Sequence, residues 1–541
     1  MAPAFLDSLT SRPYLDVGYS VWILDTESAP AGWRKNLRRR VGMGAAQKRT
    51  MRQTRPNILL ICTDQMRADM MGCAGHPVVQ TPTLDRLAGR GVRLPRAYCS
   101  APVCIPTRVS MFSGLYPHSF GKVAHIRMPI DPRIRMLPAY LADAGYRTGI
   151  VGKTHFWPPT ETYGAEGAWL TIDSHLSKEL GEHDAYKAYL REQGYSDVAD
   201  ESQLPEEHYR TRWTARESAA FIRSEDERPF FLFCSFVKPH PPYDPPEPYA
   251  SLYADADFPV PVAREEEFTT RPLFVRSRMD RDLVADPARL QGMKAKYGGL
   301  VTMLDAAIGD IVSALEETGV LDNTMIVFTS DHGEFLGDHY LRNKTLFYEA
   351  SAAIPLIMAG PDILEGQVSP ALTGHVDLLP TLLDFAGIDL PGRREGESLR
   401  PVLTTGNTEG WREAMFGELV VQLRISSEGV WSNNLKMVTT DRHKYCYYSR
   451  VLDGEGAEEE LFDLHNDPHE FENLAETAEG REICRDMRDR LLEWLARAEE
   501  HRLYPVDERY PYSTYVRETG RIEVISPESA GGAQASDKLP F

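Results

Sequence analysis

Five short apolar runs, each bounded by polar or turn-forming residues, mark the N-terminal two thirds of the chain. They lie at 57–63, 148–151, 230–236, 324–329 and 354–358. Continuous apolar runs of this length are typical of strands that are buried on both faces, as in a parallel sheet. The pattern therefore predicts parallel strands of one central sheet.

Apolar residues recur at helical spacing between these runs. The stretches with this spacing are 83–91, 137–145, 297–318 and 377–387. Asp377 is placed to cap the start of the last stretch. Strands that alternate with helices predict an α/β fold, in which a large and mostly parallel sheet is flanked by helices on both faces.

Beyond about residue 405 the pattern changes. Residues 435–448 alternate in the way of antiparallel strands, and an amphipathic helix is predicted near 480–499. We therefore expect a flexible extension at 1–52, a large α/β domain at 53–405, a smaller C-terminal α+β subdomain at 406–505 and a loose tail at 506–541.

Polar side chains directly follow four of the predicted strands. They are Asp64-Gln65, Lys153-Thr-His155, Lys238-Pro-His240 and Asp331-His332. Because ligands of open α/β sheets collect at the carboxyl ends of the strands, we expect these four clusters to converge on one cleft.

The charge of the chain excludes some classes of partner. It has 60 Lys and Arg against 79 Asp and Glu, a net charge of −19. So acidic a chain is a poor match for nucleic acid or an anionic membrane, and we expect neither as a partner. An anionic substrate would need positive charge that is gathered locally in a pocket.

Cysteine usage and hydropathy bear on the compartment. The seven cysteines form no C-x-x-C pair, which excludes zinc-ribbon and thioredoxin-type motifs and fits a reduced setting. We see no signal peptide and no apolar run of about 18 residues, so we expect a cytoplasmic protein without a transmembrane helix.

Two of the strand-end clusters have the chemistry of a metal site. Asp64 and Asp331 supply carboxylates, Gln65 an amide oxygen and His332 a neutral nitrogen. Oxygen-rich sets favour calcium, magnesium or manganese over zinc, and His332 as a direct ligand would tilt the choice toward manganese. The alternatives are that Asp64 caps a helix and that His332 is a structural histidine.

Further residues suit an oxyanion and proton transfer. Arg108, Lys153 and Lys344 are candidate cations, although a lysine such as Lys344 is more often a solvated surface residue. The candidates for proton transfer are His155 and His240. His125 and Arg127 either face the substrate or are plain surface residues, and His118 is expected to be structural.

The segment Cys104-Ile-Pro-Thr-Arg108 has the pattern C-x-P-x-R and is followed by Ser113-Gly114. On its own, Cys104 could equally be a small buried hydrophobic residue. The pattern resembles the modification signature of type I sulfatases, in which a dedicated enzyme oxidises the cysteine to formylglycine. The hydrate of that aldehyde is the nucleophile of the family.

The resemblance to the sulfatase family of the alkaline phosphatase superfamily extends over most of 55–500. The motifs that carry it are Asn57-Ile-Leu-Leu-Ile-Cys-Thr-Asp-Gln65, Thr81-Pro-Thr-Leu-Asp-Arg-Leu-Ala88, the Cys104 signature, Gly152-Lys-Thr-His155, Lys238-Pro-His-Pro-Pro-Tyr243, Thr329-Ser-Asp-His-Gly-Glu334 and Leu461-Phe-Asp-Leu-His-Asn-Asp-Pro468. Arylsulfatases, choline-sulfatases and phosphonate monoester hydrolases are the branches it is most similar to.

The resemblance implies a role for each site residue. The metal ligands would be Asp64, Gln65, Asp331, His332 and, once converted, Cys104. Arg108 would steady the hydrate, and the residues that hold sulfate and move protons would be Lys153, His155, His240 and Lys344. Many sulfatases have a second Asp at the position of Gln65 and Asn at that of His332, so these two positions bear on the substrate class.

The function that follows is metal-dependent hydrolysis of a sulfate ester to an alcohol and sulfate. The alternative is hydrolysis of a phosphonate monoester or phosphodiester at the same site, and a third interpretation is a catalytically dead binding protein. We expect one divalent cation, calcium ahead of manganese or magnesium, and a small anionic ester as substrate. A formylglycine-generating enzyme would be the partner during maturation, and homo-oligomer formation is left open.

Overall fold

The structure, a computed structural model, describes residues 55–121, 124, 129–171, 180–195, 201–390, 394–424, 430–449 and 457–501. Residues from Pro56 onward belong to one structural unit. The extension expected at 1–52 and the tail expected at 506–541 lie outside the described residues. The division expected near residue 405 stays a prediction.

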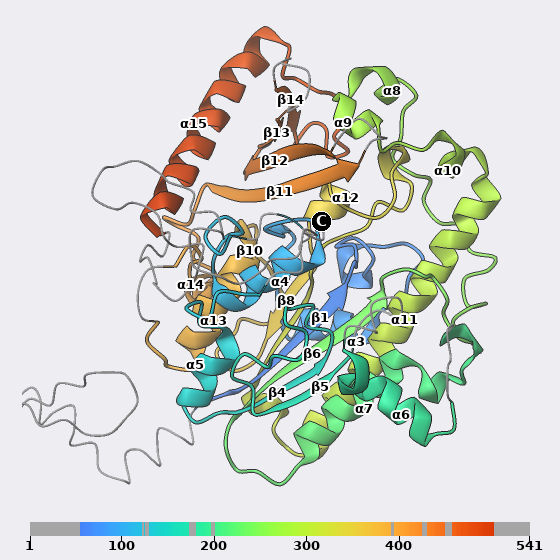
Figure 1. Ribbon diagram of the computed structural model, residues 1–541, viewed down its shortest axis with the longest axis vertical. Coiled ribbons are helices and arrows are strands. Elements are labelled where there is room, and N and C mark those ends of the chain that lie inside the picture. The colour runs from blue at the N-terminus through green and yellow to red at the C-terminus, as the bar shows by residue number, and fades with distance from the viewer. Residues whose placement is uncertain are drawn as a thin grey trace, which may run out of the picture. The chain divides into compact units, whose positions relative to one another are not determined.

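An eight-stranded sheet lies at the centre of the fold (Figure 1). Its strands are β1 Asn57–Asp64, β2 Gly91–Arg93, β4 Arg147–Gly152, β5 Gly167–Leu170, β6 Phe230–Pro239, β7 Thr324–Ser330, β8 Leu356–Ala359 and β9 Gln367–Val368, in the spatial order β5-β4-β6-β1-β7-β8-β2-β9. β3 Ala97–Tyr98 and β10 Thr373–Gly374 pair in a small separate sheet. The predicted mostly parallel sheet is confirmed.

The central strand β1 explains why the sequence shows unbroken apolar runs. It pairs in parallel with β6 on one side and β7 on the other, and all its residues are buried. Ile58 and Leu60 join the core on one face of the sheet, and Leu59 and Ile61 join the core on the other. Because β4, β6, β1 and β7 are parallel, their carboxyl ends meet at one edge of the sheet.

The direction of one predicted strand is wrong. The run at 354–358 corresponds to β8, which is antiparallel to both of its neighbours, β7 and β2. An apolar run records burial on both faces and contains no information on strand direction, so the sequence pattern could not distinguish the two cases.

Helices cover both faces of the sheet (Figure 1). α3 Pro82–Gly89, α7 Arg210–Arg223 and α11 Pro287–Glu317 pack on one face, and α4 Cys104–Ser113, α5 Leu137–Asp143 and α13 Leu378–Phe385 pack on the other. The remaining helices of this part are α6 Ala185–Glu192, α8 Glu267–Thr270, α9 Leu273–Arg276, α10 Arg281–Ala285, α12 Glu349–Ala352 and α14 Arg400–Thr405.

α11 is the longest helix among the described residues and starts well before the predicted 297–318, at Pro287, where the Asp286 side chain caps it. By length and composition it could cross a membrane. Most of its apolar segment is buried in the structure, with Leu300 and Met303 fully enclosed. The core helix of a large domain has the same length and apolar composition, and the burial of α11 fits that description.

The helix predicted at 377–387 is α13, but Asp377 does not cap it. Asp377 Oδ2 accepts from the backbone N–H of Gly374 at 2.9 Å, and Asp377 Oδ1 accepts from that of Glu397 at 2.8 Å. The carboxylate therefore ties the turn before α13 to a later segment, a contact that the local sequence does not reveal.

The C-terminal part contains the second large sheet of the fold. β11 Ala414–Arg424, β12 Val430–Thr440, β13 His443–Tyr448 and β14 Glu458–Asp463 form an antiparallel meander, and α15 Ala478–His501 packs on it (Figure 1). The antiparallel strands predicted within 435–448 and the helix predicted near 480–499 are both confirmed.

Candidate active site

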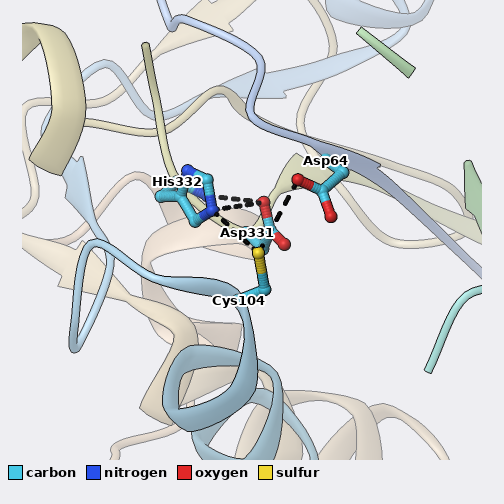
Figure 2. Close-up of side chains that lie close together, drawn as sticks. All are labelled: Asp64, Cys104, Asp331 and His332. Carbon is cyan, nitrogen blue, oxygen red and sulfur yellow. Dashed lines mark hydrogen bonds and ion pairs between the residues drawn. The ribbon is translucent and has the colours of Figure 1, made fainter. Parts of the chain in front are cut away.

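Four side chains from three elements meet at the carboxyl end of the central strands (Figure 2). Asp64 ends β1, Cys104 begins α4, and Asp331 and His332 directly follow β7. All four are buried, and one ligand atom from each lies within 4.8 Å of the others. The structure thus brings together four of the five residues that were expected to hold a metal.

Cys104 lies in the first turn of α4 and is 1% exposed. Its Sγ is 3.3 Å from His332 Nε2, 3.3 Å from Lys344 Nζ and 3.8 Å from Asp64 Oδ1. The N-terminus of a helix carries backbone N–H groups without intrahelical partners and a partial positive charge. An anion at residue 104 would therefore be stabilised by the end of α4 and by the Lys344 ammonium.

Arg108, one turn further along α4, holds the two carboxylates. Its Nε donates to Asp331 Oδ2 at 2.8 Å and its Nη2 to Asp64 Oδ2 at 3.4 Å. Its Nη1 donates to the Lys153 carbonyl and to Ser235 Oγ, both at 2.8 Å. The fully buried guanidinium is therefore engaged with the aspartates and the strand ends, and its geometry favours a positioning role.

Two lysines bring positive charge to the cluster from separate loops. Lys153 Nζ lies 2.5 Å from Asp64 Oδ2. Lys153 follows Gly152, where φ is +99° and a Cβ would lie 1.9 Å from the Ser235 carbonyl oxygen, so only glycine lets the chain turn there. Lys344 Nζ lies 2.7 Å from Gln65 Oε1, which places Gln65 at the edge of the cluster.

Positive charges around Asp64 counteract the effect of burial on its pKa. Burial and Cys104 raise the pKa of Asp64, but Lys153, His240 and Lys344 outweigh them and hold that pKa below its usual range. Asp64 is therefore ionised at neutral pH, which suits a cation ligand.

The pKa values of the neighbouring groups are shifted by the same burial and charges. Burial and then Asp64 raise the pKa of Asp331. Burial would lower the pKa of His332, but the charge of Asp331 raises it above its usual value. Burial would also lower the pKa of Lys344, but Cys104 and Asp64 raise it above its usual value. Lys344 is therefore protonated at neutral pH.

The remaining predicted histidines differ in placement. His240 is half-buried on the loop after β6, with Nδ1 2.8 Å from the Pro241 carbonyl oxygen, and its charge reaches Asp64. His155 is buried on the loop after β4 in a left-handed backbone conformation. His125 and Arg127 lie outside the described residues. The structural role expected for His118 agrees with its placement between Glu395 and Glu418.

Sequence reasoning missed a buried link between α4 and β7. His375 Nδ1 lies 2.8 Å from Thr107 Oγ1, and His375 Nε2 lies 2.9 Å from the Ser330 carbonyl oxygen. Burial lowers the pKa of His375 to about 3, so the ring is neutral, donates from Nε2 to the carbonyl and accepts the Thr107 hydroxyl at Nδ1. No local motif joins residues this far apart in the sequence. Ser235, which accepts from Arg108, was also missed, although a polar residue within an apolar run is a recognisable signal of a functional contact.

The donor set fits a divalent cation. Two carboxylates, an imidazole and the side chain of residue 104 converge in the buried interior of the fold, with the Gln65 amide oxygen beside them. Hard cations prefer such oxygen-rich surroundings, and burial of paired carboxylates is tolerated where a cation compensates them.

Comparisons with known proteins agree with this geometry. A family model described as Sulfatase matches residues 56–388, and one described as N-sulphoglucosamine sulphohydrolase, C-terminal, matches residues 337–497. The first span contains every residue of the cluster.

Relatives of known name match along most of their length. An arylsulfatase of Clostridium perfringens is 33% identical over 477 residues, which cover 82% of this chain and 95% of the relative. A choline-sulfatase of Rhizobium meliloti is 30% identical over 455 residues, which cover 79% of this chain and 83% of the relative. The crystal structure of a phosphonate monoester hydrolase of Agrobacterium radiobacter superposes with a TM-score of 0.71 at 26% identity, covering 82% of this chain and 96% of that one.

Proposed function

The chain belongs to the sulfatase family and is a sulfuric ester hydrolase, and on that premise we propose that residue 104 acts as formylglycine beside one divalent cation. The observation that carries the proposal is the burial of Cys104 against two carboxylates and an imidazole at the N-terminus of α4. A structural cysteine would need none of these charged neighbours.

The cation would be held by Asp64, Asp331 and His332, with the Gln65 amide oxygen and residue 104. Calcium suits this set of oxygen ligands, and manganese or magnesium are the alternatives. When bound, such a cation would polarise the ester and stabilise negative charge on the attacking oxygen.

The aldehyde hydrate of residue 104 would supply both an oxygen nucleophile and a second hydroxyl through which sulfate is released. Lys344, protonated and 3.3 Å from Sγ of Cys104, would donate a proton to the departing alcohol. His240, half-buried at the same edge, would support that step, and His155 would accept the proton of the second hydroxyl. Lys153 and the end of α4 would hold the sulfate oxygens.

A second candidate function is hydrolysis of phosphonate monoesters or phosphodiesters at the same site. It is favoured by the uncharged Gln65 beside the cluster and by similarity to the phosphonate monoester hydrolase and, at 28% identity, to a multifunctional alkaline phosphatase superfamily protein of Trinickia caryophylli. Rates of one preparation on an aryl sulfate and on an aryl phosphodiester separate the two; a dominant diester rate would overturn the first choice.

The proposed conversion of Cys104 to formylglycine can be tested on a single tryptic peptide. Trypsin releases Ala97–Arg108, which contains both Cys99 and Cys104. In protein from a host with a formylglycine-generating enzyme, alkylation should modify Cys99 only, and a hydrazide reagent should label residue 104. Mass spectrometry of this peptide gives both results, and a peptide alkylated at both cysteines in active protein would refute the aldehyde.

The matching substitution is Cys104→Ala. It should abolish sulfate ester turnover with no loss of fold, because the side chain is small and its role is chemical. Cys99→Ala removes a fully buried thiol five positions earlier and is the control that should retain turnover. Steady-state rates and thermal melting of both variants make the test; a Cys104→Ala variant with wild-type rates contradicts the proposal.

A further inference from the structure

The Gln65 carboxamide can present either its oxygen or its NH2 group to the cluster. Oxygen and NH2 are nearly the same in size, and only the hydrogen-bond partners decide which end points where. The backbone of Gln65 is clamped: its N–H donates to Asp331 Oδ1 at 3.0 Å, and its carbonyl accepts from the Tyr297 hydroxyl at 2.7 Å. Orientation of the amide is the remaining freedom.

The side chain of Glu334 lies against the far end of that amide. Gln65 Nε2 donates to Glu334 Oε2, which also accepts from the Tyr243 hydroxyl at 2.9 Å. The other oxygen, Glu334 Oε1, accepts from the backbone N–H groups of Asn343 at 2.5 Å and Leu336 at 3.1 Å. Glu334 is fully buried, and each of these four partners is a donor.

We propose that Glu334 is a positioning residue that fixes the orientation of the Gln65 carboxamide, so that its oxygen and not its NH2 faces the cluster. A carboxylate whose four partners all donate offers only lone pairs, so the NH2 end of Gln65 must turn toward it. Gln65 Oε1 then faces Lys344 Nζ at 2.7 Å, and Lys344 in turn touches Cys104 Sγ.

The consequence for the cation rests on the function proposed above. An amide oxygen is a ligand for a hard cation, whereas an NH2 group in the same place would repel it. Where many sulfatases have an aspartate, which presents oxygen in either orientation, a glutamine needs a neighbour that selects its oxygen.

Glu334→Gln turns this into a sharp test. The backbone N–H groups of Asn343 and Leu336 cannot rotate, so the oxygen of the new amide is required on their side and its NH2 faces Gln65. Gln65 should then invert and present NH2 to Lys344 and the cluster. Neutron diffraction of deuterated, cation-free crystals reads the orientation directly from the deuterium positions of Gln65 Nε2.

Calcium titration of the same proteins measures the consequence. Glu334→Gln should weaken calcium binding about 10- to 100-fold, as is usual when an outer-shell partner is lost. The charge-conserving swap Gln65→Glu with Glu334→Gln restores an oxygen on both sides and should recover the affinity. Tyr243→Phe removes a different donor to the same Glu334 oxygen and is the matched control, with orientation and affinity unchanged.

The outcomes are distinguishable. Wild-type crystals in which the Gln65 deuterons point toward Lys344, or an unchanged Gln65 orientation in Glu334→Gln, overturn the inference even if that variant is unstable or inactive. A swap that leaves calcium binding weak overturns it as well, because Glu334 would then act by holding the 334–343 loop. A wild-type protein that binds no divalent cation refutes the cation of the proposed function, whereas the diffraction result still decides the orientation.

Discussion

At Asp331, a single carboxylate organises three separate parts of the site. Oδ1 accepts from the backbone N–H groups of Gln65 and His332, at 3.0 and 2.9 Å, and Oδ2 accepts from Arg108 Nε at 2.8 Å. The geometry of the cluster therefore depends on both oxygens, and the charge on them compensates a fully buried guanidinium.

Asp331→Asn should separate these roles. The amide oxygen can retain both backbone donors, but its NH2 group then opposes Arg108, whose buried charge loses a partner. We expect a loss of about 3 kcal/mol in unfolding free energy and weaker calcium binding. Urea denaturation with and without calcium measures both.

The control for that variant is Asp305→Asn. Asp305 is also buried and also accepts from two backbone N–H groups, those of Thr83 and Leu84, but it lies away from the cluster. It should lose only the stability due to a helix cap, about 1 kcal/mol, and leave calcium binding intact. Equal calcium affinity in wild type and Asp331→Asn would contradict the assignment of Asp331.

Site residues whose polar side chains stand at the ends of apolar strands could be predicted from the sequence. Asp64 ends one buried parallel strand, and Asp331 and His332 directly follow its neighbour, so their meeting was foreseeable from the parallel sheet. The partners of these residues were not. Glu334 and His375 act through contacts with residues distant in the sequence, and nothing in their own neighbours signals those contacts.

At the scale of elements, α4 shows why a helix at the centre of the site escaped prediction. All residues of Cys104–Ser113 are buried, so the segment has no polar face and no helical periodicity. Pro106 also suggests a loop, although proline is tolerated in the first turn of a helix, where its missing N–H would have no partner.

Thr107→Val tests whether α4 must be tied to β7. The substitution preserves the shape of the side chain but leaves His375 Nδ1 buried without its hydroxyl donor. The expected cost is about 1–2 kcal/mol of stability and a lower kcat with little change in KM, because residue 104 would shift relative to Asp331.

Ser110→Ala is the comparison variant for Thr107→Val, because it removes another buried hydroxyl of α4, one that is bonded to Ser100 in the segment before the helix. It should lose similar stability and keep its kcat. If both variants have the same kcat loss, packing of α4 and not its link to β7 accounts for the effect.

At the scale of the molecule, the second sheet supports the loop that carries Lys344. Lys444 Nζ of β13 donates to the Phe347 carbonyl at 2.9 Å, and Glu460 of β14 accepts from the Tyr348 hydroxyl at 2.7 Å. The Glu349 N–H donates to Glu470 Oε2 at 2.7 Å. The sequence predicted both sheets but not this dependence, since strand patterning does not identify which loop a buried charge will hold.

A pH-dependent link joins the second sheet to the segment that follows α4. Burial would lower the pKa of His118, but its bonds to Glu395 and to Glu418 of β11 raise that pKa to about 9. Because the folded value exceeds the unfolded value of about 6.5, the stabilisation is complete below pH 6.5 and is lost as pH rises through about 9. Lys436 donates to Glu418, and the Trp494 ring packs edge-on against the His118 ring.

The corresponding prediction concerns the unfolding midpoint between pH 6.5 and 9.5. His118→Gln should lower stability by up to about 3 kcal/mol at pH 6.5 and should flatten its decline toward high pH. His465→Gln, at a surface-exposed ring, serves as the comparison and should follow the wild type. An undiminished slope in His118→Gln would refute the link.

The contacts of the second sheet and its flanking loop with residues 347–349 limit how domains can be exchanged between such enzymes. A chimera that takes its C-terminal sheet from another sulfatase would inherit foreign partners for Phe347, Tyr348 and Glu349, three to five positions from the proposed acid. Recombination between relatives would therefore succeed only when this short segment travels together with the sheet that encloses it.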